Sequence, residues 1–338
     1  MHRPTIAMFV SATALLTACA ASRPEPVAPT APATSPPAPT VSSAAASSSA
    51  AAAPKPAVDA ARVGTLTGAK PETTDNVVKV SFPRADLPVE VDGWKMAPFM
   101  GLTSWAAFVP GEKAGIETMV MGDVVLFEDE VNLAMSAALD NGLEVTALHN
   151  HFFFDKPRVY FMHIGGEGGL DQLAKGVKAI VDAERGVRAK SAQPSNAFGA
   201  APKGPSAIDA AKLDSVFGLK GTSKDGMYKA TMGRKAQAAC GCTVGKAMGV
   251  NTWAAFAGTD DDAIVDGDFA VAEDELQPVL KALRAASINV VAIHSHMTNE
   301  HPRILFLHYW GRGKATDLAS KVKRAVDLTA WDGKTSST

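Results

Sequence analysis

Apolar and polar positions follow one order in two blocks of the chain. Each block opens with a short helical segment (58–67 and 208–217) and a strand-like segment (77–82 and 227–231). A helix with apolar positions at 3.6-residue spacing follows, and then two segments, EVTALHNH and RVYFMHI in the first block, favour an antiparallel pair of strands. A second amphipathic helix closes each block. This order predicts an α+β fold, with helices on one face of a mainly antiparallel sheet.

The two blocks are copies of each other. Residues 122–182 align with residues 267–327 at a constant offset of 145 without a gap, and 22 of the 61 pairs are identical. SWAAF and TWAAF match further upstream at an offset of 148. The chain is therefore predicted to hold two homologous tandem α/β-sandwich domains. Their predicted boundaries are repeat 1 at 58–185, a linker at 186–207, repeat 2 at 208–330 and a tail at 331–338.

The N-terminus resembles that of an exported lipoprotein. Residues 1–18 read as a signal peptide with a short apolar run, which ends in Leu-Thr-Ala-Cys, a sequence similar to a bacterial lipobox. This predicts lipidation at Cys19 and a membrane-anchored protein outside the cytoplasm. The alanine after the cysteine resembles the outer-membrane class. Residues 19–57 are rich in Ala, Pro and Ser, which predicts an extended tether.

Composition narrows the set of partners. The chain has 33 basic and 35 acidic residues and no long basic run, so a nucleic-acid partner is not predicted. Apart from Cys19, the sequence contains only Cys240 and Cys242. Two such thiols can bind Cu(I), form a bridge, or simply be small and buried. No P-loop, HExxH, nucleophile elbow or dinucleotide motif points to a specific reaction.

The repeated segments resemble a known family. GDVVLFEDEV…LEVTALHNHFFFDKPRVYFMHIGG and its partner GDFAVAEDEL…INVVAIHSHMTNEHPRILFLHYWG are similar to the LppY/LpqO family of bacterial lipoproteins. That resemblance implies one or two copies of a domain of unknown function and a lipid anchor, and it brings no established activity. The first repeat departs from the pattern, with three phenylalanines at 152–154 and Gly165 where the second has Trp310.

Six histidines occupy duplicated positions: His149, His151 and His163 in repeat 1, and His294, His296 and His308 in repeat 2. Residues i and i+2 of a strand point to the same face, so the two histidines of each HxH motif project together. The third histidine joins them only in one strand register, and a shift of one residue turns it away. Three imidazoles suit zinc or copper better than magnesium or calcium. Structural hydrogen bonding and acid–base or anion-binding roles remain open alternatives.

Charged residues near the histidines suggest two further roles. Glu130 and Glu275 end the EDE triplets, where carboxylates favour a helix N-terminus; the alternative makes them partners of a metal ligand, or a base. Arg158 and Arg303 each follow a proline and could bind an anion, or pair with those acidic residues.

Three functions follow from these patterns. The first is an envelope-anchored protein that binds a transition metal or small ligand. The alternatives are a metal-dependent hydrolase or related enzyme with a carboxylate base, and a purely structural envelope protein. The sequence does not identify a substrate.

Overall fold

The computed structural model describes residues 56–196 and 200–333, all of which fall in one compact unit of the chain. The predicted signal peptide, the lipidation site at Cys19 and nearly all of the tether lie outside the described residues, as does the end of the tail from residue 334. Within the part that is described, no helix is long and apolar enough to cross a membrane.

Repeat 1 contains three α-helices and nine strands. In chain order they are α1 (Ala60–Thr67), β1 (Pro71–Thr74), β2 (Val77–Pro83), β3 (Val89–Val91), β4 (Trp94–Met96), the 3-10 turn η1 (Pro98–Met100), β5 (Thr103–Pro110), β6 (Thr118–Phe127), α2 (Val131–Asp140), β7 (Glu144–His149), β8 (Asp155–Lys156), β9 (Val159–Gly168) and α3 (Leu170–Lys190).

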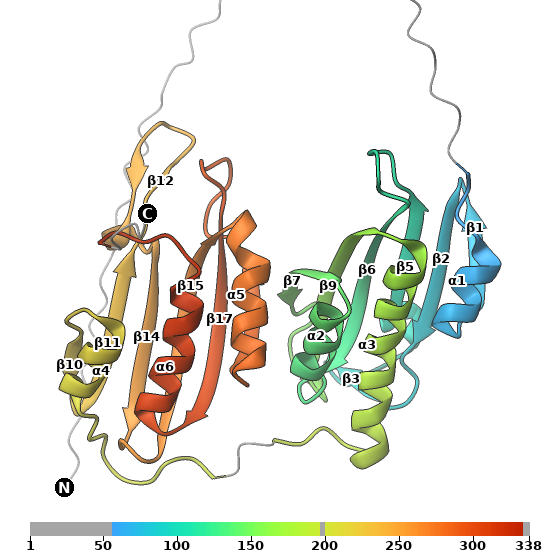
Figure 1. Cartoon of the computed structure of the whole chain (residues 1–338). Helices are drawn as coiled ribbons and strands as arrows, with labels where there is room; N and C mark the ends of the chain where they lie inside the picture. Colours follow the sequence, from blue (N-terminus) through green and yellow to red (C-terminus); the bar gives the residue numbers. More distant parts are fainter. Residues whose placement is uncertain (1–55, 197–199, 334–338) are drawn as a thin grey trace, which may run out of the picture. The chain divides into compact units, whose positions relative to one another are not determined.

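Repeat 2 follows the same plan. Its elements are α4 (Ala210–Phe217), β10 (Thr222–Lys224), β11 (Met227–Gly233), β12 (Ala236–Gln237), β13 (Thr243–Val244), η2 (Lys246–Met248), β14 (Asn251–Gly258), β15 (Ala263–Ala272), α5 (Glu273–Ala285), β16 (Asn289–His294), β17 (Ile304–Gly313) and α6 (Ala315–Val326). In each repeat the helices cover one face of the sheet (Figure 1). This confirms the predicted α+β fold with mainly antiparallel strands.

Matching signals start and stop the first helix of each repeat. The side chain of Asp59 accepts a hydrogen bond from Arg62 N at the start of α1, and Asp209 caps α4 by accepting from Ala211 N. Each helix ends at a glycine with positive φ, 71° at Gly68 and 68° at Gly218. A short polar side chain at the N-cap and a left-handed glycine at the C-terminus are common helix boundaries.

The main strands of the two repeats join in one sheet of twelve, in the order β1-β2-β5-β6-β9-β7-β16-β17-β15-β14-β11-β10. The two repeats meet where β7 lies beside β16, a junction that we call the seam. It has a single register pair, Leu148 opposite Ile293. Beside it, Asn132 Nδ2 donates to Val290 O (3.1 Å) and Val290 N donates to Asn132 Oδ1 (2.8 Å). The side-chain amide of Asn132 therefore extends the junction beyond the single register pair.

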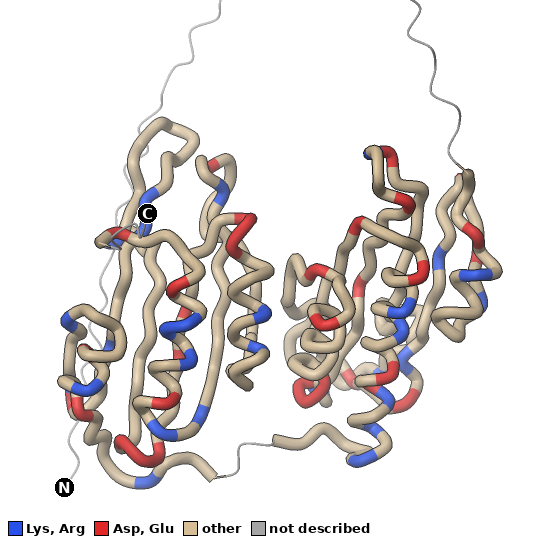
Figure 2. Tube along the Cα trace, in the orientation of Figure 1, with Lys and Arg blue, Asp and Glu red and all other residues tan. Residues whose placement is uncertain are grey.

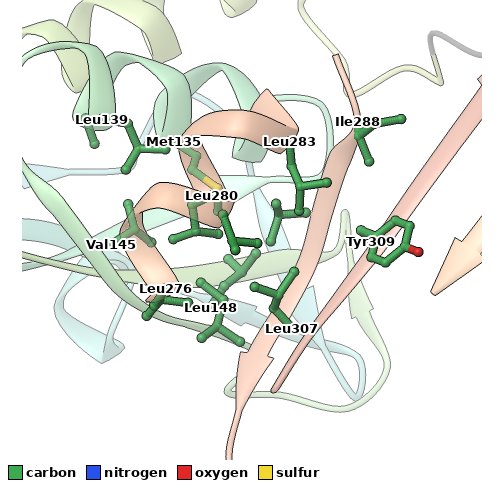
Figure 3. Close-up of a cluster of buried hydrophobic side chains, with 14 of the residues drawn as sticks. Met135, Leu139, Val145, Leu148, Leu276, Leu280, Leu283, Ile288, Leu307 and Tyr309 are labelled. Carbon is green, nitrogen blue, oxygen red and sulfur yellow. The ribbon is translucent and has the colours of Figure 1, made fainter. Parts of the chain in front are cut away.

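Gln277 forms the reciprocal bonds of the seam. Its Nε2 donates to Val145 O (2.8 Å), and its Oε1 accepts from Val145 N (3.1 Å). On the helix side, Met135 and Leu148 of repeat 1 gather with Leu276 and Leu280 of repeat 2 in one buried cluster (Figure 3). The two repeats thus share a core as well as a sheet.

The sheet face opposite the helices carries a second, smaller apolar layer. Along β9, Met162 and Ile164 belong to the core under the helices. The alternate residues Val159 and Phe161 pack instead with a separate cluster that includes Phe127. Because successive strand residues point to opposite faces, His163 shares the face of Phe161. The candidate site lies on this face.

Candidate metal centre

The strand register brings the three histidines of repeat 1 together. His149 of β7 pairs with Phe161 of β9, and Ala147 pairs with His163, with a bulge between Val145 and Ala147. This is the register that turns His163 to the same face as His149. Repeat 2 has the same arrangement, because His294 pairs with Phe306 and Ala292 with His308. The sequence left this register open.

In repeat 1 the imidazoles form a compact cluster. The Nε2 atoms of His149 and His151 lie 3.2 Å apart. The His163 ring stacks on that of His149 with centroids 5.1 Å apart and an interplanar angle of 12°. His151 in turn stacks on Phe161 at 3.3 Å between centroids, which fixes its ring over β9.

Repeat 2 reproduces this geometry closely. The Nε2 atoms of His294 and His296 are 3.0 Å apart. The rings of His294 and His308 stack with centroids 5.0 Å apart at 16°, and His296 stacks on Phe306 at 3.4 Å. Nδ1 of His308 lies 3.4 Å from Gly267 O. A backbone carbonyl at one ring nitrogen leaves the other nitrogen for a ligand role.

Each cluster also has a carboxylate that the sequence analysis missed. Asp123 of β6 stands opposite His163 in the sheet register, and Asp268 of β15 stands opposite His308. In both, the Oδ1 atom is buried and has no hydrogen-bond partner among the described residues. The repeated Gly-Asp of GDVVLF and GDFAVA was the available signal, since this aspartate is identical in both copies.

Burial sets the charge state of these groups. It lowers the pKa of His149 and His151, and of His294 and His296, below the ordinary histidine value, and neighbouring imidazoles lower it further, although Asp123 acts in the opposite direction in repeat 1. The lowered pKa of these four rings favours the neutral form, which is the form that binds a metal. Burial also raises the pKa of Asp268 to about 6, and the nearby His308 works against this rise.

The cluster offers three nitrogen donors and one oxygen donor in each repeat. Two nitrogens that bind one ion at about 2.0–2.1 Å can be at most about 4.2 Å apart, and both Nε2 pairs meet that condition. Without a metal, the same contact is an N–H···N hydrogen bond between neutral rings. As the side chains stand among residues 56–196 and 200–333, no three His, Cys, Asp or Glu side chains lie close enough together to hold a metal ion.

The contacts of Glu130 are with the backbone of Phe127 and with two arginines. It is fully buried at the start of α2, where it accepts from Phe127 N (2.9 Å) and pairs with Arg84 and Arg188. Burial opposes the charge on Arg84, yet the carboxylates around it raise its pKa. Glu130 therefore anchors the start of its helix to two arginines.

Glu275 has the corresponding role in repeat 2. It lies in the first turn of α5, accepts from Ala272 N (2.9 Å) and Ala330 N (2.8 Å), and pairs with Arg234. In repeat 2 the EDE triplet forms the first turn of α5, whereas in repeat 1 the triplet ends at the N-cap residue Glu130 and α2 begins after it. Acidic and basic residues are interspersed along both repeats (Figure 2).

The remaining candidates lie at the surface. Arg158 is 4.0 Å from Glu128, and Arg303 is 3.6 Å from Glu273, with both arginines about half exposed. Each arginine thus lies beside the first glutamate of the EDE triplet in its own repeat. Cys240 and Cys242 are exposed and joined by a disulfide in the loop between β12 and β13. They are thus neither buried thiols nor part of the histidine cluster.

Comparisons with known proteins identify the family of the chain and give no relative of known function. A search of curated proteins finds no match. One solved structure, the crystal structure of a trimeric bacterial microcompartment shell protein PduB, is similar over 76% of this chain and 89% of that one, at 11% identity and a TM-score of 0.21. So low a score supports no argument about fold or function. The signature of a domain of unknown function (DUF1259) matches residues 61–183 and again 211–328, and the chain belongs to this family as a tandem member.

Proposed function

We propose that this chain is an LppY/LpqO-type lipoprotein, anchored outside the cytoplasm through Cys19, whose two repeats each bind a transition-metal ion. The observation that carries the proposal is the paired Nε2 atoms at 3.2 and 3.0 Å, each pair with a third imidazole stacked beside it. The same geometry recurs in two copies that differ at 39 of the 61 aligned positions.

The donor set selects the class of ion. Neutral imidazoles suit zinc and copper, whereas magnesium and calcium prefer oxygen ligands. The buried Oδ1 atoms of Asp123 and Asp268 lack hydrogen-bond partners in the described structure, so they can accept an ion or a water bound to it. In each repeat the third imidazole, which stacks on its neighbour, would turn about its side-chain bonds to share an ion with the pair.

Metal analysis tests the proposal. The full chain, purified in mild detergent, is stripped with a chelator, loaded with zinc and freed of excess metal by gel filtration. Two equivalents per chain are expected. His296→Ala and His151→Ala should each retain one, and the double variant none, with unchanged circular dichroism. His301→Ala is the matched control, because His301 is an exposed histidine outside the six and should retain both equivalents.

Two results would contradict the proposal. If the wild-type protein binds no metal, the histidine clusters are structural. If the single variants unfold and the wild type is metal-free, the N–H···N bonds hold the loops of the two HxH motifs. The anchor is tested separately, since Cys19→Ala should move the protein from the membrane fraction to the soluble fraction, and a variant that still pellets without detergent removes that part of the proposal.

A further inference from the structure

Repeat 1 has a hollow beside its histidine cluster, called the His163 hollow here. Its volume is about 620 Å³, and His163, Met119, Met121, Glu144 and Thr146 are among the residues that line it. His163 therefore has the paired imidazoles of His149 and His151 close by and two thioether side chains bordering the same open space. The proposed function assigns no role to this hollow.

The sheet register places both thioethers on the same face of the sheet as His163. Met119 and Met121 alternate with Asp123 on β6, so all three side chains lie on the histidine face. Met121 stands opposite Gly165, which is two residues from His163 on β9. Diagonal neighbours on adjacent strands come within reach when a side chain is long. Met121 is thus a diagonal neighbour of His163.

Gly165 provides the space that Met121 needs. A Cβ atom built at Gly165 would meet only Val120 O, at 3.8 Å, so the position opposite Met121 is open. Met121 is half exposed, at 50%. Methionine has three rotatable bonds and a polarizable sulfur, so it can turn toward an ion without moving the strand.

Repeat 2 does not contain these features. The positions that correspond to Met119 and Met121 hold Ile264 and Asp266. Trp310 takes the place of Gly165 and stands opposite Asp266 in the register of β15 and β17. The large indole occupies the side of the strand that is bare in repeat 1, and no sulfur borders the histidine cluster from this strand.

These differences change the set of possible ligand atoms beside the two histidine clusters. Thioether ligands are soft and select Cu(I), whereas imidazole and carboxylate groups also accept zinc. We propose that repeat 1 binds Cu(I) through the imidazole of His163 and the sulfurs of Met119 and Met121, and that repeat 2 does not. This rests on the proposed function, because it takes the histidine cluster as a metal site and assigns the ion.

An anaerobic titration tests the assignment. The full chain is titrated with Cu(I) held by a chromophoric chelator, and X-ray absorption reports the atoms bound to copper. One equivalent with sulfur in the first shell is expected. Replacing both methionines (Met119→Leu with Met121→Leu) should weaken Cu(I) binding at least 100-fold and leave two zinc equivalents. The control is Met100→Leu with Met248→Leu, two exposed methionines elsewhere, which should change neither.

Introducing the two methionines and the glycine into repeat 2 gives a second measurement. Ile264→Met, Asp266→Met and Trp310→Gly together should give repeat 2 a tight Cu(I) equivalent with sulfur, while Gly165→Trp should remove the one in repeat 1. Copper bound only by nitrogen, equal Cu(I) binding by both native repeats, or no effect of the leucine pair would overturn the inference and leave the zinc sites intact. Loss of zinc binding in both wild-type repeats would instead remove the proposed function, so the two failures are distinguishable.

Discussion

The surroundings of the two histidine clusters differ more than the clusters do. The Nε2 pairs agree within 0.2 Å, at 3.2 and 3.0 Å, and the stacked rings within 0.1 Å, at 5.1 and 5.0 Å. Beside them, repeat 1 has methionines and a glycine where repeat 2 has Ile264, Asp266 and Trp310. The comparison teaches that the strand pair and its phenylalanine position the imidazoles, while neighbouring positions on β6 and β15 are free to change what the imidazoles meet.

The ion pairs at the start of α2 also differ from those at the start of α5. In repeat 1, Glu130 pairs with Arg84 and Arg188, and the buried Glu184 lies 3.6 Å from Arg84. In repeat 2 only the pair of Arg234 and Glu275 is equivalent, and both of its side chains are slightly exposed. At an offset of 145, Thr329 and Gly333 replace Glu184 and Arg188. The fold therefore accepts a simple pair where repeat 1 has a buried network.

The largest expected loss of folding stability comes from removing Arg84, beside the start of the second helix of repeat 1. Arg84→Ala leaves Glu130 with Arg188 alone and removes the cation beside Glu184, and removing one partner of a buried ion pair costs about 3–5 kcal/mol. Arg234→Ala should cost less, about 1–3 kcal/mol, because its pair retains some contact with water. Urea unfolding measures both free energies. Equal losses in the two variants would show that the larger network adds nothing.

Glu184 gives the network a pH dependence. Burial raises its pKa from 4.5 to about 8, with Arg84 acting in the opposite direction. A raised folded-state pKa means that its contribution to stability is complete below pH 4.5 and is lost as pH rises toward 8. At about 1.4 kcal/mol per pH unit, the loss from pH 5 to pH 7 is about 2–3 kcal/mol.

Glu184→Gln should therefore remove most of this decline in the free energy of unfolding between pH 5 and pH 7. Asp182→Asn on the same helix is the control, because Asp182 is about half exposed and pairs with Lys178 at the surface. A Glu184→Gln variant whose stability declines as steeply as that of the wild type would show that Glu184 titrates normally.

The seam offers a symmetric prediction of intermediate size. Asn132→Ala and Gln277→Ala each remove two hydrogen bonds to the backbone of the other repeat, at Val290 and Val145. Each should lower the free energy of unfolding by about 1–2 kcal/mol, since the freed backbone groups are partly buried. Chemical denaturation of both variants checks this. A large loss in one and none in the other would show that only one side of the seam bears on stability.

The smallest effects belong to the surface arginines. Arg158→Ala and Arg303→Ala remove ion pairs at 4.0 and 3.6 Å between exposed side chains, so each should change stability by less than about 0.5 kcal/mol. Metal content should also stay at the wild-type level. A variant that loses metal would show that its guanidinium takes part in the site after all.

Much of the fold was readable from the sequence because it rests on periodicity. The helical spacing of Val131, Ala134 and Met135 predicted α2, and the constant offset of 145 predicted the second copy. Register and pairing partners were not readable. The pairing of His149 with Phe161 puts His163 on the same face as His149, and nothing in the local sequence fixes that register. The seam depends on a contact between residues 145 positions apart, which an alternating pattern does not encode.

The candidate site was predicted in part for the same reason. The HxH motifs identified their own shared face, since two residues of one strand are enough to define it. Asp123 and Asp268 were missed because each comes from a different strand, β6 or β15, and enters the site only through cross-strand pairing. Glu130 was given an open role near the histidines because sequence cannot show that Arg84, 46 residues earlier, lies beside it.

The reciprocity of the seam has a consequence for quaternary structure. Asn132 binds Val290, and Gln277 binds Val145, which are the same two positions with their roles exchanged at an offset of 145. A contact of this kind is self-complementary, as in an isologous dimer. A chain with a single copy of the repeat would expose β7 as an open sheet edge, which is an aggregation hazard. Such a chain is expected to sediment as a homodimer with a twofold axis through the position of Leu148, and a stable monomer would show that the edge is protected in another way.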